Sequence, residues 1–139
     1  MFVDEPDPII LIDDDEDDCE LFIECCKKAG LKNAVITFRN FNEAFDYLYQ
    51  TEMRPFLIMC DINMPLVNGL ELRNKIDTTE RLRLKAIPFL IWSTSNEPAL
   101  VDMAYSLNIQ GYFKKPAEIS TLVMMLARIS DYWKISQHP

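Results

Sequence analysis

Asp61 is the residue whose position most strongly suggests chemistry. It follows a run of apolar residues at 56–60 and precedes a segment rich in turn-forming residues that ends in Asn68-Gly69. A short apolar run bounded by turn residues predicts a buried strand of a parallel sheet. The Asp61 carboxylate would then lie at the carboxyl end of that strand, where ligands bind in open α/β sheets. An isolated aspartate at such a position is also typical of a simple turn. A functional role for Asp61 therefore depends on other reactive side chains lying beside it.

A run of six acidic residues at 13–18 supplies the first partners. It follows an apolar run at 9–12 and opens a segment with helical spacing, so Asp13 and Asp14 are expected at the end of a first strand. The acids at 16–18 are well placed to begin the helix, because negative charge is favourable at a helix N-terminus. Carboxylates gathered near Asp61 repel one another unless a cation joins them, and their hard oxygen ligands suit Mg²⁺.

Two other classes of protein use aspartate-rich loops of this kind. An EF-hand needs a glycine at the sixth loop position, which is Asp18 here. Phosphatases with an aspartate nucleophile carry Asp-x-Asp followed by a small hydrophobic residue or threonine, and are usually larger. Both classes fit less well than a magnesium site at the end of a sheet.

Ser93 and Lys115 follow two further strands, expected at 87–92 and 111–113. Taken singly, the serine is typical of a turn or helix cap and the lysine of a solvated surface residue. Strand ends of one parallel sheet share an edge, so both side chains are expected beside Asp61 and Asp13. Acids, a hydroxyl and a lysine at the ends of four strands of one sheet indicate a functional site more specifically than any one of these residues does.

The remaining pattern predicts one α/β domain. Another strand is expected at 34–38, and Asn40 is a candidate cap for the helix that follows it. Further helices are expected at 70–76, 99–107 and 119–133, so strands and helices alternate five times. Such alternation predicts a parallel five-stranded sheet with helices on both faces, a three-layer sandwich.

Composition limits the possible functions. The chain has 139 residues, 49% of them hydrophobic, and a net charge of −8, with eleven of its 22 acids before residue 25. Nothing concentrates positive charge for binding nucleic acid, and no run is long enough to cross a membrane. The acidic start lacks the features of a signal peptide, so a cytoplasmic location is expected. The four cysteines show no metal-ligand spacing and are expected as buried thiols.

The chain resembles the receiver domains of response regulators in two-component signalling over nearly its whole length. The motifs that carry the resemblance are Ile-Leu-Ile-Asp-Asp-Asp (10–15), Cys-Asp-Ile-Asn-Met-Pro-x-x-Asn-Gly (60–69), Ile-Pro-Phe-Leu-Ile-Trp-Ser-Thr-Ser (87–95) and Gly-Tyr-Phe-Lys-Lys-Pro (111–116). Departures from the commonest pattern are small: Ser93 stands where threonine is more frequent, Thr94 where alanine is usual, and Trp92 is bulkier than typical.

The resemblance implies a (βα)5 flavodoxin-like fold and assigns roles to particular residues. Residues 1–139 would form one receiver domain with a core of about 8–134. The implied roles are phosphate acceptor for Asp61, Mg²⁺ ligands for Asp13, Asp14, Asp61 and the backbone carbonyl of Asn63, phosphoryl contacts for Ser93 and Lys115, a cis bond for Lys115-Pro116, and a switch role for Ser93 and Tyr112.

The implied function is a self-resetting switch rather than a conventional enzyme. A sensor histidine kinase or a histidine phosphotransfer protein would donate the phosphoryl group, and the chain would catalyse its own phosphorylation and dephosphorylation. Output would pass to an unknown downstream protein or to a second copy, through the surface made by the fourth helix, fifth strand and fifth helix. Two alternatives remain: a pseudo-receiver that binds partners without phosphate, and a receiver excised from a longer regulator.

Overall fold

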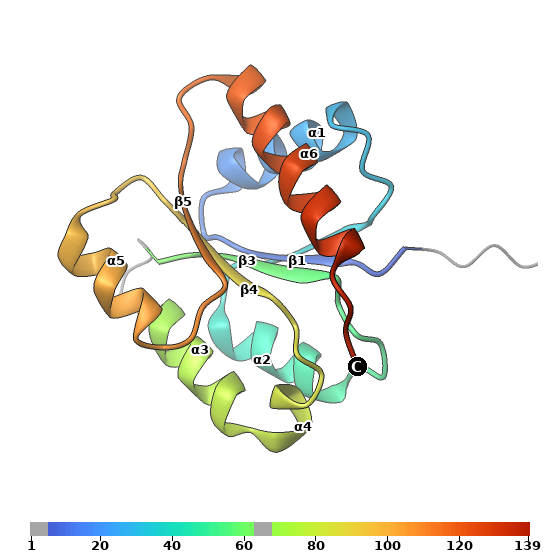
Figure 1. Ribbon diagram of the computed structural model, residues 1–139, viewed down its shortest axis with the longest axis vertical. Coiled ribbons are helices and arrows are strands. Elements are labelled where there is room, and N and C mark those ends of the chain that lie inside the picture. Colours follow the sequence, from blue (N-terminus) through green and yellow to red (C-terminus); the bar gives the residue numbers. More distant parts are fainter. Residues whose placement is uncertain (1–5, 63–67) are drawn as a thin grey trace, which may run out of the picture.

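The computed structural model describes residues 6–62 and 68–139, and its centre is a five-stranded sheet in which every strand runs parallel (Figure 1). The strands are β1 (Ile9–Ile12), β2 (Val35–Phe38), β3 (Leu57–Asp61), β4 (Phe89–Ser93) and β5 (Gly111–Lys114), in the order β2-β1-β3-β4-β5. This order confirms the predicted α/β class and flavodoxin-like sheet. The fourth strand starts later than expected because Pro88 has no N–H to donate to a ladder.

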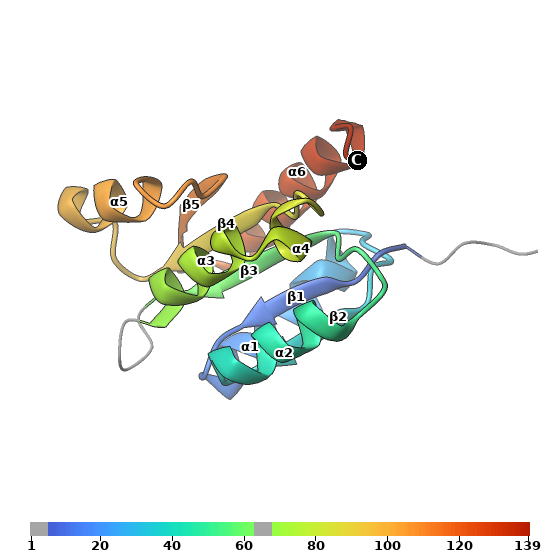
Figure 2. The ribbon, with the colours of Figure 1, turned by 90° about the horizontal axis from the view of Figure 1, so that it is seen from below.

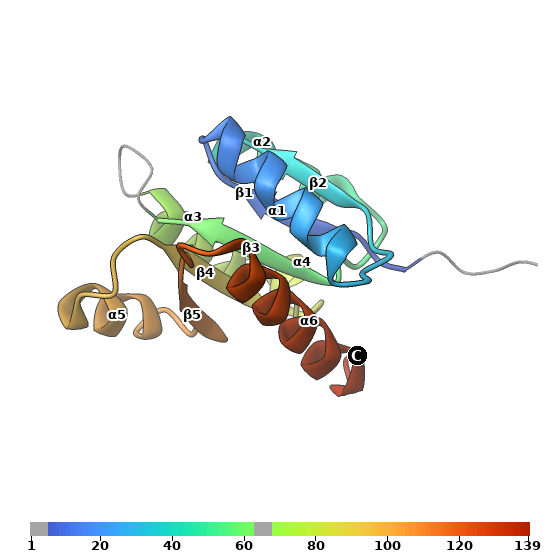
Figure 3. The same cartoon turned by 90° about the horizontal axis from the view of Figure 1, so that it is seen from above.

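Helices cover both faces of the sheet. They are α1 (Glu16–Lys28), α2 (Phe41–Gln50), α3 (Asn68–Thr78), α4 (Glu80–Arg83), α5 (Pro98–Tyr105) and α6 (Ile119–Ile135). Figure 2 shows α2, α3 and α4 in front of the sheet, and Figure 3, from the other side, shows α1 and α6 in front of it. The short α4 was not predicted. It makes α5 and α6 the helices that the sequence counted as fourth and fifth.

Two hydrophobic cores follow from the alternation of side chains along each strand. On β1, Ile10 and Ile12 pack with α2–α5, whereas Ile9 and Leu11 pack with α1 and α6. Successive strand residues point to opposite faces, and both faces here are covered. That is why the central strands consist almost entirely of apolar residues.

Side chains cap the N-termini of α1 and α2. Asn40 accepts hydrogen bonds from the backbone N–H groups of Asn42 and Glu43, which confirms it as the cap of α2. Asp15 caps α1 by accepting from the N–H of Asp18. In the described part of the chain, no helix is long and apolar enough to span a membrane.

All four cysteines are buried free thiols, as expected. Burial raises the pKa of the Cys19 thiol to about 11 and that of Cys26 to about 12. Thiols with such pKa values stay protonated near neutral pH and act as small apolar side chains.

Candidate functional site

The predicted site residues meet at the carboxyl edge of the sheet. Asp13 directly follows β1, Asp61 is the last residue of β3 and Ser93 the last of β4, and Lys115 directly follows β5. The order of the strands reverses between β1 and β3, where adjacent connections leave toward opposite faces. Open α/β sheets bind ligands at this switch point. Four residues separated widely in sequence are therefore neighbours for a topological reason.

Asp13, Asp14 and Asp61 each offer a carboxylate oxygen, and the three oxygens lie within 4.8 Å of one another. Asp13 and Asp61 are buried, with 0% and 4% of their surface exposed, whereas Asp14 faces solvent. Hard oxygen ligands with one open side fit a divalent cation such as Mg²⁺ or Mn²⁺. The expected contribution of the Asn63 carbonyl lies outside the described residues.

Lys115 supplies the cation of the described site. Its Nζ lies 3.0 Å from Asp13 Oδ2 and 3.2 Å from Asp61 Oδ2, with the Trp92 ring centroid 4.6 Å away. The backbone N–H of Lys115 donates to the Ser93 carbonyl at 2.7 Å, which holds the start of this loop against β4. The ammonium therefore sits over the acidic cluster, as predicted.

The expected cis bond between Lys115 and Pro116 is wrong for this structure, because the described residues contain no cis peptide bond. An X–Pro bond intrinsically prefers the trans form by about 0.5–1 kcal/mol.

Asp18 is a member of the site that the sequence did not reveal. Its Oδ2 lies 2.8 Å from Lys115 Nζ, closer than either Asp13 or Asp61. The sequence pattern indicates only that Asp18 is an acid at the start of α1, a role that its neighbours Glu16 and Asp17 share. The available signal was helical position: the first turn of α1 begins at the edge of the sheet, so one of its acids can face the site.

Burial and charge have opposite effects on the titrating groups. Burial raises the pKa of the Asp13 carboxyl from 3.8 to about 6, although the N–H of Asp15 and the Lys115 ammonium lower it in part. Burial lowers the pKa of Lys115, but its hydrogen bond to Asp18 and the charges of Asp61 and Asp13 raise it by more. Lys115 therefore remains an ammonium at neutral pH.

Ser93 is connected to Tyr112 through one residue. The Ser93 hydroxyl is buried and accepts from the backbone N–H of Ser95 at 3.1 Å. The Tyr112 hydroxyl donates to the carbonyl of the same Ser95 at 2.6 Å, while its ring is half-buried beside the α2–α5 core. Both residues named for the switch thus hold the loop after β4.

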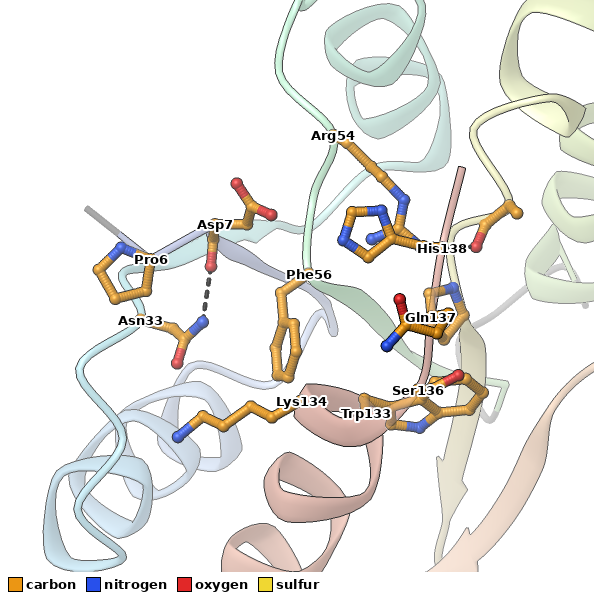
Figure 4. A pocket seen from close by; sticks show the side chains of 12 residues that line it. Pro6, Asp7, Asn33, Arg54, Phe56, Trp133, Lys134, Ser136, Gln137 and His138 are labelled. Atoms are coloured by element: carbon orange, nitrogen blue, oxygen red, sulfur yellow. Dashed lines mark hydrogen bonds between the residues drawn. The ribbon is translucent and has the colours of Figure 1, made fainter. Parts of the chain in front are cut away.

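A separate cavity of about 510 Å³ opens at the opposite, amino end of the strands (Figure 4). Two of its polar residues make structural bonds: Arg54 donates to the carbonyls of Lys85 and Ala86, and Asn33 donates to that of Asp7. Phe56 and Trp133 supply the aromatic part of the wall. Its described lining holds one carboxylate, so it lacks the convergent acids of the carboxyl edge.

Comparison with known proteins finds the same architecture. The family model described as "Response regulator receiver domain" matches residues 9–127. The probable methanogenesis regulatory protein FilR2 of Methanothrix harundinacea is 29% identical over 133 residues, covering 93% of this chain and 84% of that protein.

Two solved structures are similar over nearly the whole chain. The phosphorylated cyanobacterial phytochrome response regulator RcpA has a TM-score of 0.82 and 29% identity, covering 96% of this chain and 98% of its own. The Mn²⁺-bound form of response regulator Rcp1, a protein of Synechocystis sp., has a TM-score of 0.79 and 27% identity, covering 96% of this chain and 99% of its own.

Proposed function

Because this chain belongs to the response regulator receiver family, we propose that Asp61 is its phosphate acceptor and that Ser93 and Lys115 contact the transferred group. The observation that carries this proposal is the Lys115 ammonium, 3.2 Å from Asp61 at the edge where the acids converge. A lone buried carboxylate would repel an incoming phosphoryl group. A fixed ammonium beside it offsets that repulsion and stabilises negative charge during transfer.

The protein side chains that take part in the transfer all lie at this edge of the sheet. An Asp61 carboxylate oxygen attacks phosphorus, while the bond from phosphorus to the donor, a histidine nitrogen or the acetyl oxygen of acetyl phosphate, breaks and its electron pair leaves with the donor. Lys115 pairs with a phosphoryl oxygen, and the Ser93 hydroxyl donates to another. Water later attacks the phosphorus of the aspartyl phosphate, and the bond from phosphorus to the Asp61 oxygen breaks with its electron pair returning to the carboxylate. Inorganic phosphate leaves, which resets the switch.

We assign a Mg²⁺ site to Asp13, Asp14 and Asp61, with the Asn63 carbonyl as a further ligand. A bound Mg²⁺ would supply positive charge beside the phosphoryl oxygens. Support comes from the carboxylate oxygens within 4.8 Å of one another and from the Mn²⁺-bound form of the related Rcp1.

Receiver domains interact with histidine kinases and downstream proteins. For this chain we propose a sensor histidine kinase or phosphotransfer protein as donor, with the cytoplasm as the compartment, which the buried free thiols support. The proposed output surface is formed by α5, β5 and α6, and serves a downstream protein or a second copy. Its helices expose large apolar side chains: Met103 and Tyr105 on α5, and Ile119 and Met124 on α6.

Intact-mass spectrometry after incubation with acetyl phosphate and MgCl₂ tests the acceptor. We expect one phosphate adduct on the wild type and none on Asp61→Asn. Asp46→Asn, an exposed acid on α2, is the matched control and should be phosphorylated like the wild type. An adduct on Asp61→Asn would place the acceptor elsewhere. A folded wild type that takes no phosphate from any donor would favour a phosphorylation-independent binding module.

A further inference from the structure

Lys115 is held by three carboxylates. Its Nζ lies 2.8 Å from Asp18, 3.0 Å from Asp13 and 3.2 Å from Asp61. An ammonium has three N–H donors, so these three bonds use its whole capacity. The shortest is made to Asp18, for which neither the sequence motifs nor the proposed phosphotransfer supplies a role.

The three carboxylates differ in what else is required of them. Asp61 is the proposed acceptor, and one of its oxygens becomes part of the bond to phosphorus. Asp13 and Asp61 also belong to the cluster that fits a divalent cation, whereas Asp18 does not. Of the three, Asp18 alone is free to keep its bond to Lys115 throughout the reaction.

The local structure holds Asp18 in a fixed place beside Lys115. It lies in the first turn of α1, and its own N–H is bound by the Asp15 cap, so its backbone is held in place. Its side chain is 34% exposed and that of Lys115 is 11% exposed. Ion pairs between partly buried side chains with such short contacts are charge-assisted hydrogen bonds, which are stronger than bonds between neutral groups.

We propose that Asp18 is a positioning residue for phosphotransfer: it holds the Lys115 ammonium beside Trp92 so that one N–H stays directed at the acceptor. This inference rests on the proposed function of Asp61. Without Asp18, the long lysine side chain samples other rotamers, and the ammonium is misplaced when phosphorus arrives. Small misplacements of charged groups in a site slow transfer markedly.

The competing explanation is that Asp18 only favours the N-terminus of α1 through its negative charge. Asp17 is the matched control, because it is the neighbouring acid in the same helical turn and is exposed. Asp18→Ala removes both carboxylate oxygens that can bind the Lys115 ammonium, whereas Asp18→Asn retains one oxygen that can bind it. If Asp18 positions Lys115, phosphorylation should be fastest in the wild type, slower in Asp18→Asn and slowest in Asp18→Ala. Asp17→Ala should react at close to the wild-type rate.

The first measurement is the rate of phosphorylation by acetyl phosphate with MgCl₂, followed by intact mass. We expect Asp18→Ala to be slower by roughly tenfold to a hundredfold, and Asp18→Asn to recover part of the loss. Equal slowing of Asp17→Ala, or a wild-type rate for Asp18→Ala, overturns the proposal while leaving Asp61 as the acceptor. A wild type that takes no phosphate instead contradicts the proposed function.

The second measurement needs no phosphoryl donor. Beryllofluoride with Mg²⁺ occupies the position of the phosphoryl group and engages Asp13 and Asp61, so it tests Asp18 as the remaining carboxylate that holds Lys115. In a Trp133→Phe background, Trp92 is the remaining tryptophan, and its ring lies 4.6 Å from the ammonium. In beryllofluoride with Mg²⁺ we expect the Trp92 emission of Asp18→Ala to shift toward that of Lys115→Met, with Asp17→Ala like the wild type. Wild-type emission in a folded Asp18→Ala protein would mean that the ammonium has not moved, and would overturn the proposal.

Discussion

At the scale of single residues, the site contains charged side chains that would be unfavourable to bury without partners. Asp13 is completely buried, and its carboxylate bonds to the N–H of Asp15 and the ammonium of Lys115. These partners offset only part of the loss of hydration, so its pKa lies at about 6. An acid kept in this state is poised to accept a cation, which replaces the lost hydration with direct coordination.

The raised pKa predicts how stability depends on pH without metal. Between about pH 4 and 6 the folded protein binds a proton at Asp13 that the unfolded chain releases, so the free energy of unfolding falls as pH rises. The shift from 3.8 to about 6 corresponds to about 3 kcal/mol. Asp13→Asn should remove this part of the slope in urea unfolding curves measured in EDTA. Asp17→Asn should keep it, and an unchanged slope in Asp13→Asn would contradict the assignment.

At the scale of elements, β5 links the site to the proposed output surface. The Tyr112 hydroxyl on β5 donates to the Ser95 carbonyl in the loop between β4 and α5. The backbone N–H of Ser95 in turn donates to the Ser93 hydroxyl. A displacement of Ser93 toward a phosphoryl oxygen would therefore disturb the contact of Tyr112. A half-buried ring with one polar end can adopt a second position when that contact is lost.

We expect beryllofluoride with Mg²⁺, as a mimic of the phosphoryl group, to change the oligomeric state of the protein in light scattering. Tyr112→Ala should abolish this change while Asp61 still takes phosphate from acetyl phosphate. Tyr49→Ala, which removes an exposed ring from α2, is the control and should behave like the wild type. An undiminished response in Tyr112→Ala would contradict the switch role of this residue.

At the scale of the whole molecule, the acidic cluster connects parts of the chain that are far apart in sequence. Asp13 and Asp14 follow β1 and Asp61 ends β3, so a cation bound to all three joins two central strands. Unfolding separates these ligands. A cation that binds only the folded chain therefore stabilises the entire domain rather than one loop.

Thermal melts with and without millimolar MgCl₂ test this stabilisation. At about 100 times the dissociation constant the gain is roughly 2.7 kcal/mol, which raises the melting temperature by several degrees. NaCl of equal ionic strength controls for screening. Asp17→Asn should respond like the wild type, whereas Asp13→Asn should lose most of the response. Identical melting temperatures with and without MgCl₂ in the wild type would count against a metal site.

The residue pattern predicts the architecture and most of the site. Apolar runs that end in Asp13, Asp61 and Ser93 predict buried parallel strands, and the carboxyl ends of parallel strands must share an edge. The observed strand bounds differ from the predicted ones by one or two residues. The helix α4 was not predicted because a segment of four residues is too short to show helical periodicity.

Which charged side chains meet depends on how the helices pack against the sheet. Asp17 and Asp18 both lie in the first turn of α1, yet only the packing of α1 on the sheet brings Asp18 to Lys115, 97 residues away. Arg73 is similar: from α3 it donates to the carbonyls of Leu107 and Asn108, which no local pattern indicates. Periodicity fixes the face of a helix that is buried, but long polar side chains find partners only after the helices have packed.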